Sequence, residues 1–424
     1  MSSTTEAART PSPQPDDRRR PGFNEVLHDI ASGSPLRILF AVLLSLLVGS
    51  LLIIFTDEDV LDTLPYFFGR PVDFFAEAGR SAGDAVAALF RGSIYNYNAA
   101  TFEGAIRPLT ESLRFAGPLI AAGLGIALSF RVGLFNIGGT GQLLVGAAFA
   151  AWASFQLHLP PVIHLIVAML FGFLGAALWA GIVGVLKART GAHEVIVTIM
   201  LNYIAIGVVT YLMRTPVLHD PESGNNPLTR PPDENAQLPR LFGENFNLHL
   251  GFILAIAAVF VYWWLMERST LGFRLRMVGL NPDAARTAGI NVNRIFITAM
   301  VLSGAFVGLA AINQALGRSG SFSPSVDAGI GFDAITVALL GGSRAFGVAF
   351  AGLLFGAMKA AGPAMQIEDI APEVLTVVQS LIVLFVAAPP LVRAIFRFLP
   401  EPRAADLQRS TRRRPTLEQK EEAP

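Results

Sequence analysis

The sequence predicts an all-α, polytopic membrane protein with about ten transmembrane helices and both termini in the cytoplasm. Composition is the first reason: 52% of the 424 residues are hydrophobic and only 15% are charged, which is too apolar for an ordinary soluble domain. The second reason is that the apolar residues gather in ten runs. The third is that arginines are concentrated in particular loops, although the formal net charge is zero.

The chain begins with a segment that we do not expect to fold. Residues 1–35 are rich in Ser, Thr, Pro and charge, so we interpret them as a disordered cytoplasmic tail. The first apolar run, 36–55, is long enough for a spanning helix and lacks a small-residue cleavage pattern, which argues against a signal peptide. We therefore expect a membrane domain over 36–399 and a second cytoplasmic tail over 400–424.

Two long loops are predicted to lie outside, because cytoplasmic loops carry an excess of Lys and Arg. The loop 56–107 has eight acids against four arginines, and the loop 214–249 has five acids against three. Within the first, the apolar residues of 71–92 recur at helical spacing and predict an amphipathic helix at the membrane interface. Contact with an extracytoplasmic partner and a merely solvated surface are both open for these loops.

Nine further spans are predicted from apolar runs near the length that crosses a hydrocarbon core of about 30 Å. Their approximate bounds are 108–130, 132–155, 162–186, 192–213, 250–266, 295–316, 330–342, 346–361 and 374–391. The run 330–342 is short, and joining it to the next would give nine spans in all. The Arg-rich C-terminal tail would then lie outside, whereas ten spans put every Arg-rich loop in the cytoplasm.

The loop 267–294 is predicted to be cytoplasmic because it has five arginines against two acids. Asn281 and Pro282 make a favourable helix start, 283–288 a short helix, and Gly289 a natural end. A short cytoplasmic helix with such defined ends predicts a docking element for another protein.

The order of the spans is compatible with an inverted repeat, in which two halves of a membrane fold cross in opposite directions. Spans two to five begin outside, and spans seven to ten begin inside. The segments "FNIGGTGQLLVGAA" and "DAGIGFDAITVALLGG" both place glycines and polar residues at the start of a span. Their similarity is weak, so a chance resemblance is the alternative.

The stretch "RVGLFNIGGTGQ" puts helix-weakening glycines and polar side chains where the chain enters a span. In lipid, a broken helix is tolerated only where protein or a water-filled cavity surrounds it. We therefore interpret Phe135, Asn136, Thr140 and Gln142 as lining a pathway for an uncharged polar solute. The alternative is that the glycines are packing surfaces that let helices approach closely.

Two more polar clusters lie in predicted spans. Glu194, Thr198 and Asn202 recur every four residues, so they share one helical face. Glu194 is close to the cytoplasmic boundary and is given a structural or gating role, while Thr198 and Asn202 are placed in the pathway. The third cluster combines Asp333 with three neutral residues, Asn313, Gln314 and Thr336. Asp333 is assigned to the pathway because an acid inside a span is costly, with helix capping as the alternative.

Four motifs now carry a resemblance to a known family. In order between residues 109 and 392, they are "RVGLFNIGGTGQ", "HEVIVTIMLNYIA", "LGFRLRMVGLNPDAARTAGINVNR" and "GIGFDAITVALLGG". They resemble permease subunits of bacterial ABC importers for nucleosides, within the branched-chain amino acid and simple-sugar permease group. The resemblance implies a multi-pass protein of the bacterial inner or plasma membrane that imports nucleosides by alternating access. It also implies that five residues of the cytoplasmic loop contact an ATPase: Asp283, Ala284, Ala285, Arg286 and Gly289.

The resemblance implies four partners: a cytoplasmic ATP-binding subunit, a second permease subunit, an extracytoplasmic substrate-binding lipoprotein and the lipid bilayer. The sequence lacks the G-x-x-x-x-G-K-[ST] phosphate loop, so ATP is expected to bind the partner subunit. No cofactor, metal, catalytic residue or nucleic-acid partner is expected for the chain, whose six histidines have no ligand spacing. A simple-sugar importer and an ion-coupled secondary transporter that uses Asp333 are the alternatives.

Overall fold

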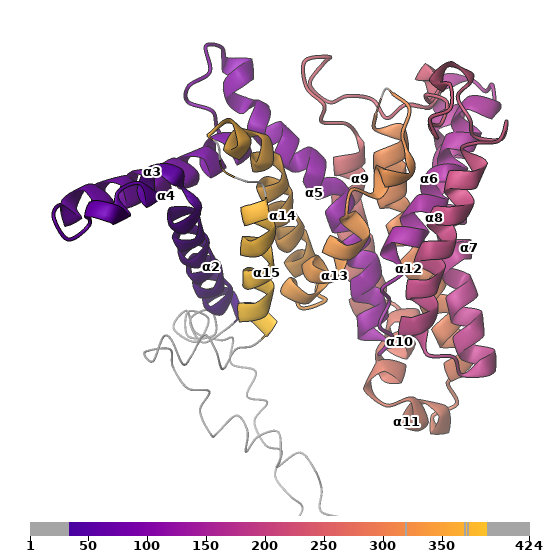
Figure 1. Cartoon of the computed structure of the whole chain (residues 1–424). Helices are drawn as coiled ribbons and strands as arrows, with labels where there is room; N and C mark the ends of the chain where they lie inside the picture. Colours follow the sequence, from indigo (N-terminus) through magenta and orange to yellow (C-terminus); the bar gives the residue numbers. More distant parts are fainter. Residues whose placement is uncertain (1–33, 319, 369, 371–372, 388–424) are drawn as a thin grey trace, which may run out of the picture. The chain divides into compact units, whose positions relative to one another are not determined.

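The computed structural model describes residues 34–318, 320–368, 370 and 373–387, and regular structure in that part of the chain is entirely helical. Residues 44–387 form one compact unit. The predicted cytoplasmic tails lie outside the described residues, apart from Ser34 and Pro35. Figure 1 shows the helices by label.

The helices and their bounds are as follows in chain order. They are α2 (Ser34–Thr56), α3 (Glu58–Leu61), α4 (Pro71–Ser93), α5 (Phe102–Arg131), α6 (Gly139–Gln156), α7 (Pro161–Thr190), α8 (Glu194–Leu212), α9 (Gly251–Arg268), α10 (Thr270–Leu280), α11 (Pro282–Thr287), α12 (Val292–Leu316), α13 (Ile330–Leu340), α14 (Ala345–Ile367) and α15 (Glu373–Ala387). A short 3₁₀ helix, η4 (Pro324–Asp327), precedes α13.

Six helices of the described residues are long and apolar enough to cross a membrane, namely α5, α7, α8, α9, α12 and α14. Shorter apolar segments, Leu43–Thr56 and Glu373–Ile382, lie in α2 and α15. These helices confirm the prediction of an all-α, polytopic membrane protein. The count of ten crossing segments stays a prediction.

Two predicted bounds differ from the structure for identifiable reasons. α5 begins at Phe102 rather than near Pro108, because Thr101 caps it by accepting a hydrogen bond from the Gly104 N–H. Pro108 lies inside this helix, where its nitrogen donates no backbone hydrogen bond, so it does not mark the start. The third span was predicted from residue 132, but α6 begins at Gly139, since residues 132–138 are held in a non-helical loop.

The predicted amphipathic helix over 71–92 is confirmed as α4. Its buried face repeats at helical spacing and consists of Ala78, Ser81, Ala85, Ala88 and Gly92. α4 packs closely on α14, where a β-carbon added to Gly92 would stand 2.6 Å from the Cβ of Ala364.

The helices α5–α8 and the helices α12–α15 make corresponding contacts. α5 packs against α12, α13 and α14, and α12 packs against α5, α6 and α7. α6 also contacts α7 and α8, as α13 contacts α14 and α15. Among these eight helices, exchanging α5–α8 with α12–α15 therefore reproduces the same pairs in contact.

The centre of the bundle is built from small residues. A β-carbon on Gly125 of α5 would lie 2.5 Å from the carbonyl oxygen of Ser303 on α12, and one on Gly304 would lie 2.5 Å from that of Ala176 on α7. Close backbone approach of this kind is how helices pack in a membrane, where apolar burial alone does not drive association. α10 and α11 lie at one end of this unit, and the segment between α8 and α9 lies at the other (Figure 1).

Candidate functional site

The first part of the site is the break between α5 and α6. α5 ends at Arg131, Gly133 turns the chain with a φ of +77°, and residues 134–137 have no regular structure. A β-branched or bulky residue would be strained at such a φ, which explains glycine here. The polar groups of this loop must find partners within the protein if the break lies at membrane depth.

The partners come mostly from α8. The backbone N–H of Phe135 donates to Glu194 Oε1 at 3.5 Å, and the N–H of Ile137 donates to Thr198 Oγ1 at 3.4 Å. Asn202 binds on both sides: its Nδ2 donates to the Ile137 carbonyl at 2.9 Å, and its Oδ1 accepts from the Gly141 N–H at 2.8 Å. The shared face predicted for Glu194, Thr198 and Asn202 is therefore the face that holds the loop.

Glu194 also forms an ion pair across the turn between α7 and α8. Its Oε2 lies 2.8 Å from Lys187 Nζ. The carboxylate thus joins the end of α7, the start of α8 and the Phe135 backbone. This geometry fits the structural role that the sequence indicated for Glu194.

A buried network closes the loop from its other side. Asn136 Oδ1 accepts from the Gly138 N–H at 2.8 Å and from Gln142 Nε2 at 3.1 Å, while Asn136 Nδ2 donates to Ser303 Oγ at 2.9 Å. Ser303 Oγ then donates to the Gly125 carbonyl at 2.7 Å. All three side chains are at most 1% exposed, so their polar groups are satisfied inside the protein. Ser303 was not identified from the sequence, because a lone serine in an apolar helix carries no positional signal.

The second part of the site is a matching break before α13. Ala328 and Gly329 both adopt left-handed backbone angles, with φ of 48° and 77°. Asp327 caps the helix that follows, because its Oδ1 accepts from the Gly331 N–H at 3.0 Å. Gln314 Nε2 donates to the Val326 carbonyl at 2.8 Å and so ties the end of α12 to this turn.

The two breaks meet. Thr140 Oγ1, in the first turn of α6, donates to Asp327 Oδ2 at 3.3 Å. A β-carbon on Gly139 would lie 2.7 Å from the Gly331 carbonyl oxygen, so the starts of α6 and α13 are in direct backbone contact. At Gly139 the structure therefore shows the close packing given as the alternative, and the solute pathway stays a prediction.

An ion pair stands beside the junction. Lys359 Nζ of α14 lies 2.8 Å from Asp333 Oδ2 and donates to the Ala328 carbonyl at 3.1 Å. The capping role considered for Asp333 belongs to Asp327. Lys359 was missed, although a lysine within an apolar helix is itself a signal of function, because a charge is costly there unless it is paired.

The remaining predicted residues differ in exposure. Phe135 is 42% exposed and stacks on Phe130, with ring centroids 4.8 Å apart. Thr140, Asn202 and Asp333 are half-buried, and Thr198 is fully buried. Asn313 is not brought to Asp333, because its Nδ2 donates within α12 to the Leu309 carbonyl and its Oδ1 faces Gly251.

The predicted short helix in the Arg-rich loop is confirmed as α11. Asn281 Oδ1 caps it by accepting from the N–H groups of Asp283 and Ala284, at 2.9 and 3.1 Å, and Gly289 ends the turn with a φ of +80°. Ala285 is buried, whereas the side chains of Asp283 and Arg286 are 89% and 65% exposed. The helix α10 in the same loop was not predicted.

α10 connects this loop to the first break. Glu267, at the end of α9, bridges two arginines: its Oε1 lies 2.7 Å from Arg131 Nη2 at the end of α5, and its other oxygen pairs with Arg276 of α10. Gly279 of α10 packs against the backbone of Arg131 and Val132. The helix α10 therefore contacts the chain immediately before the Gly-rich loop, residues 132–138, that joins α5 to α6.

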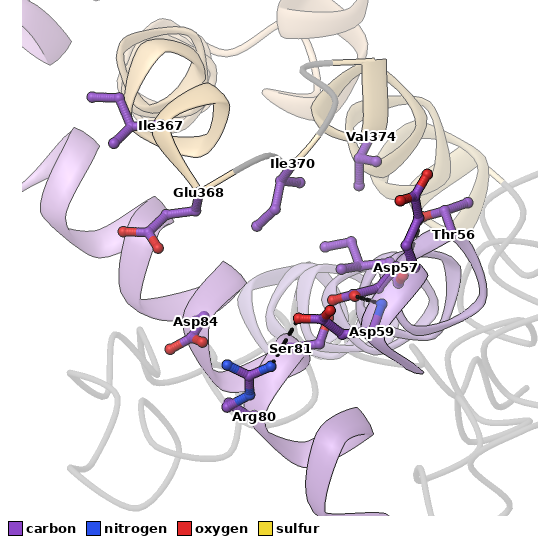
Figure 2. Close-up of a pocket in the computed structure, with 12 residues that line it drawn as sticks. Thr56, Asp57, Asp59, Arg80, Ser81, Asp84, Ile367, Glu368, Ile370 and Val374 are labelled. Carbon is purple, nitrogen blue, oxygen red and sulfur yellow. Dashed lines mark hydrogen bonds and ion pairs between the residues drawn. The ribbon is translucent and has the colours of Figure 1, made fainter. Parts of the chain in front are cut away.

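A separate polar cavity of about 640 Å³ lies between α2, α3, α4 and the segment joining α14 to α15. Figure 2 shows it, with Arg80 paired to Asp59 at 3.0 Å. Its lining includes five acids, Asp57, Glu58, Asp59, Asp84 and Glu368. No predicted pathway residue lines it, so we treat it as distinct from the junction.

Comparison with known proteins gives a consistent result over most of the chain. The family model for branched-chain amino acid transport system permease components matches residues 109–387. The guanosine ABC transporter permease protein NupP of Bacillus subtilis is 39% identical over 75% of this chain and 89% of its own length. The nucleoside ABC transporter permease protein NupB of Lactococcus lactis is 34% identical over 73% and 86%.

A sugar transporter subunit is also similar. The glucose ABC transporter permease protein TsgB13 of Haloferax volcanii is 36% identical over 65% of this chain and 75% of its own length. None of the solved structures matches the chain.

Proposed function

The chain belongs to the family of branched-chain amino acid transport system permease components. Within this family, we propose that the solute it carries is a nucleoside. The chain is a permease subunit of an ABC importer and a multi-pass protein of the plasma membrane. The observation that carries the choice of nucleosides is the likeness to the guanosine and nucleoside permeases over about three quarters of the chain.

The proposed pathway runs past the junction of the two breaks. Phe135, Thr140, Asn202 and Asp333 have exposed or half-buried side chains there and are the residues that we expect to meet the solute. Asn136, Gln142 and Thr198 are buried in this structure, so we propose that they support the break from behind in this state. Their direct contact with solute stays a prediction.

The proposed topology has ten crossing segments and cytoplasmic termini, with α6 and α13 as partial spans that begin inside the membrane. An inverted repeat of α5–α8 and α12–α15 is supported by their matching contacts. The opposite directions of the two halves are supported by the contacts of α10. The end of α5, at Arg131, contacts α10, and α10 also packs on α12, the first helix of the other half. Broken helices that meet at the interface of two repeats are the usual place for a substrate site in transporters.

The proposed energy source is a separate ATP-binding subunit that docks on α11 through Asp283, Ala284, Ala285, Arg286 and Gly289. A movement of α11 would be transmitted to the proposed pathway through α10 and Glu267, since both contact the chain around Arg131. Alternating access would then follow from rigid-body movement around the junction. The chain itself is proposed to bind no cofactor, because ATP belongs to the partner.

The other proposed partners are an extracytoplasmic binding lipoprotein, a second permease subunit and the surrounding lipid. α8 presents a broad apolar surface that includes Ile196, Met200, Tyr203, Ile204 and Tyr211. Such a surface is suited either to lipid or to a second permease subunit, where it would be covered.

Uptake by the assembled transporter tests the solute. Excess unlabelled nucleosides should suppress guanosine uptake, whereas nucleotides should not, because the Lys359 charge is already neutralised by Asp333. The glucose permease relative supports one alternative, a simple sugar. Suppression by ribose or glucose alone, without an effect of nucleosides, would favour it.

A further inference from the structure

We propose that Asp333 and Lys359 together bind the vicinal hydroxyl groups of the ribose. This inference rests on the proposed nucleoside transport and names the part of the solute that the junction recognises. The two residues then determine the preference for ribonucleosides over nucleosides that lack both hydroxyls.

Asp333 has unused capacity to accept hydrogen bonds. Its Oδ2 is taken by Lys359 Nζ at 2.8 Å, and Oδ1 has no hydrogen-bond partner among the described residues. The side chain is 26% exposed, so a solute at the junction can reach it. A carboxylate with a free oxygen accepts well from hydroxyl groups, as in folds where an acid binds a ribose hydroxyl.

Lys359 has a donor to spare. An ammonium group carries three N–H donors, of which two are directed to Asp333 Oδ2 and the Ala328 carbonyl. The side chain is 24% exposed. Its two fixed contacts hold the ammonium group in place, so the third donor is pre-oriented for a neutral oxygen atom.

The fixed backbone around the pair defines the site. Ala328 and Gly329 are left-handed, and a β-carbon on Gly329 would stand 3.8 Å from Asp333 Oδ2 and 3.9 Å from Lys359 Nζ. Asp327, the residue before this turn, accepts a hydrogen bond from the Thr140 hydroxyl group. The pair is therefore anchored to the same junction as the proposed pathway residues.

The chemistry favours a neutral diol over a charged solute. Two adjacent hydroxyl groups donate to Asp333 and accept from Lys359 without separating the pair. A phosphate or an amino-acid zwitterion would have to replace one partner by its own charge, which leaves the other charge of this partly buried pair uncompensated. A vicinal diol, as on a ribose, is a neutral solute group that matches one free acceptor beside one free donor.

The test compares guanosine with 2′,3′-dideoxyguanosine in uptake by the complete transporter. For the wild type we expect roughly a tenfold or greater preference in kcat/KM for guanosine, because hydrogen bonds to charged groups are among the stronger ones. The double variant Asp333→Asn/Lys359→Gln removes both charges and leaves neither unpaired. Its preference should fall to about two- to threefold, the low end of what a neutral hydrogen bond contributes.

A second ion pair supplies the matched control. Lys187 and Glu194 are also 2.8 Å apart, and Lys187 is 25% exposed. The variant Lys187→Gln/Glu194→Gln should retain the wild-type preference even if its overall uptake falls. If the junction variant does not transport, the same two nucleosides are compared by the thermal stabilisation that each gives to the purified complex.

The possible results distinguish a failure of the diol site from a failure of nucleoside transport. Guanosine uptake with an unchanged preference in the junction variant overturns the diol site and leaves nucleoside transport intact. Loss of the preference in both double variants also overturns it, because the effect would not be local. Suppression of guanosine uptake by leucine would indicate a zwitterion site instead. Absence of any nucleoside uptake by the wild type removes the proposed function, and the diol site with it.

Discussion

Gly139 and Gly331 are in backbone contact, since a β-carbon on Gly139 would stand 2.7 Å from the Gly331 carbonyl oxygen. Gly139→Ala should therefore lower the free energy of unfolding by about 1–3 kcal/mol, the usual cost of overpacking. Gly79→Ala is the control, because Gly79 lies in the exposed part of α4 with no atom within 4 Å of an added β-carbon. It should be neutral or stabilising by up to about 1 kcal/mol. Thermal unfolding in detergent measures both, and equal midpoints would contradict the contact.

Asn136 and Phe135 are neighbours with opposite expected effects. Asn136→Ala leaves the Gly138 N–H and the Gln142 amide short of a partner, so it should cost about 1–3 kcal/mol of stability. Phe135→Ala removes a 42% exposed ring and should change stability less. It should weaken nucleoside uptake by severalfold, on the order of 1 kcal/mol for a lost aromatic contact. Unfolding midpoints and uptake constants are measured for each, and wild-type uptake by Phe135→Ala would place the pathway elsewhere.

Arg286 and Glu267 separate docking from transmission. Arg286→Glu should abolish transport-coupled ATP turnover, because it reverses an exposed charge on α11 while the membrane helices keep their contacts. Glu267→Gln should leave the ATPase bound and turning over but reduce uptake severalfold, since it weakens the bridge from α10 to Arg131. Arg189→Glu, at the exposed end of α7, is the control for a charge change on the same side. Normal coupling in Arg286→Glu would refute docking at α11.

His249 predicts how stability depends on pH. It lies buried just before α9, and burial lowers its pKa from 6.5 to about 4, helped by Arg114 and Arg240 and opposed by Glu111. The unfolded chain takes up a proton below about pH 6.5 while the folded chain does not, so stability falls as the pH drops toward 4. Between pH 7 and pH 5 the loss should be roughly 2 kcal/mol.

The histidine contribution is isolated by substitution. His249→Gln should remove that part of the pH dependence, seen as a smaller drop of the unfolding midpoint between the two pH values. His158→Gln serves as the comparison because His158 is exposed. An identical pH profile for His249→Gln and the wild type would show that the ring is not the source.

The sequence determined the membrane fold and most of the helices without any tertiary information. Long apolar runs predict helices because a spanning backbone must satisfy its own hydrogen bonds. Local signals were sufficient for α4, from the spacing of its apolar residues, and for α11, from Asn281, Pro282 and Gly289. The motifs indicated the family, which the comparisons then confirmed.

The tertiary structure decided which polar residues meet. The sequence placed Glu194, Thr198 and Asn202 on one face, but only packing shows that this face binds the backbone of the Gly-rich loop. The packing of the helices likewise brings together Asp327 and Thr140, which are 187 positions apart in the sequence. Such contacts depend on how helices cross, and helical periodicity reports only the face of each helix.

Lys359 and Asp333 show the same limit most clearly. Each is a charge within an apolar stretch and was open to notice from the sequence alone. That they pair at 2.8 Å, beside the contact of Gly139 with Gly331, follows from the meeting of α13 and α14 at the second break. The sequence determined that the charges are present, and the packing of the two helices decided that they neutralise each other, because the energy of a pair depends on distance and burial.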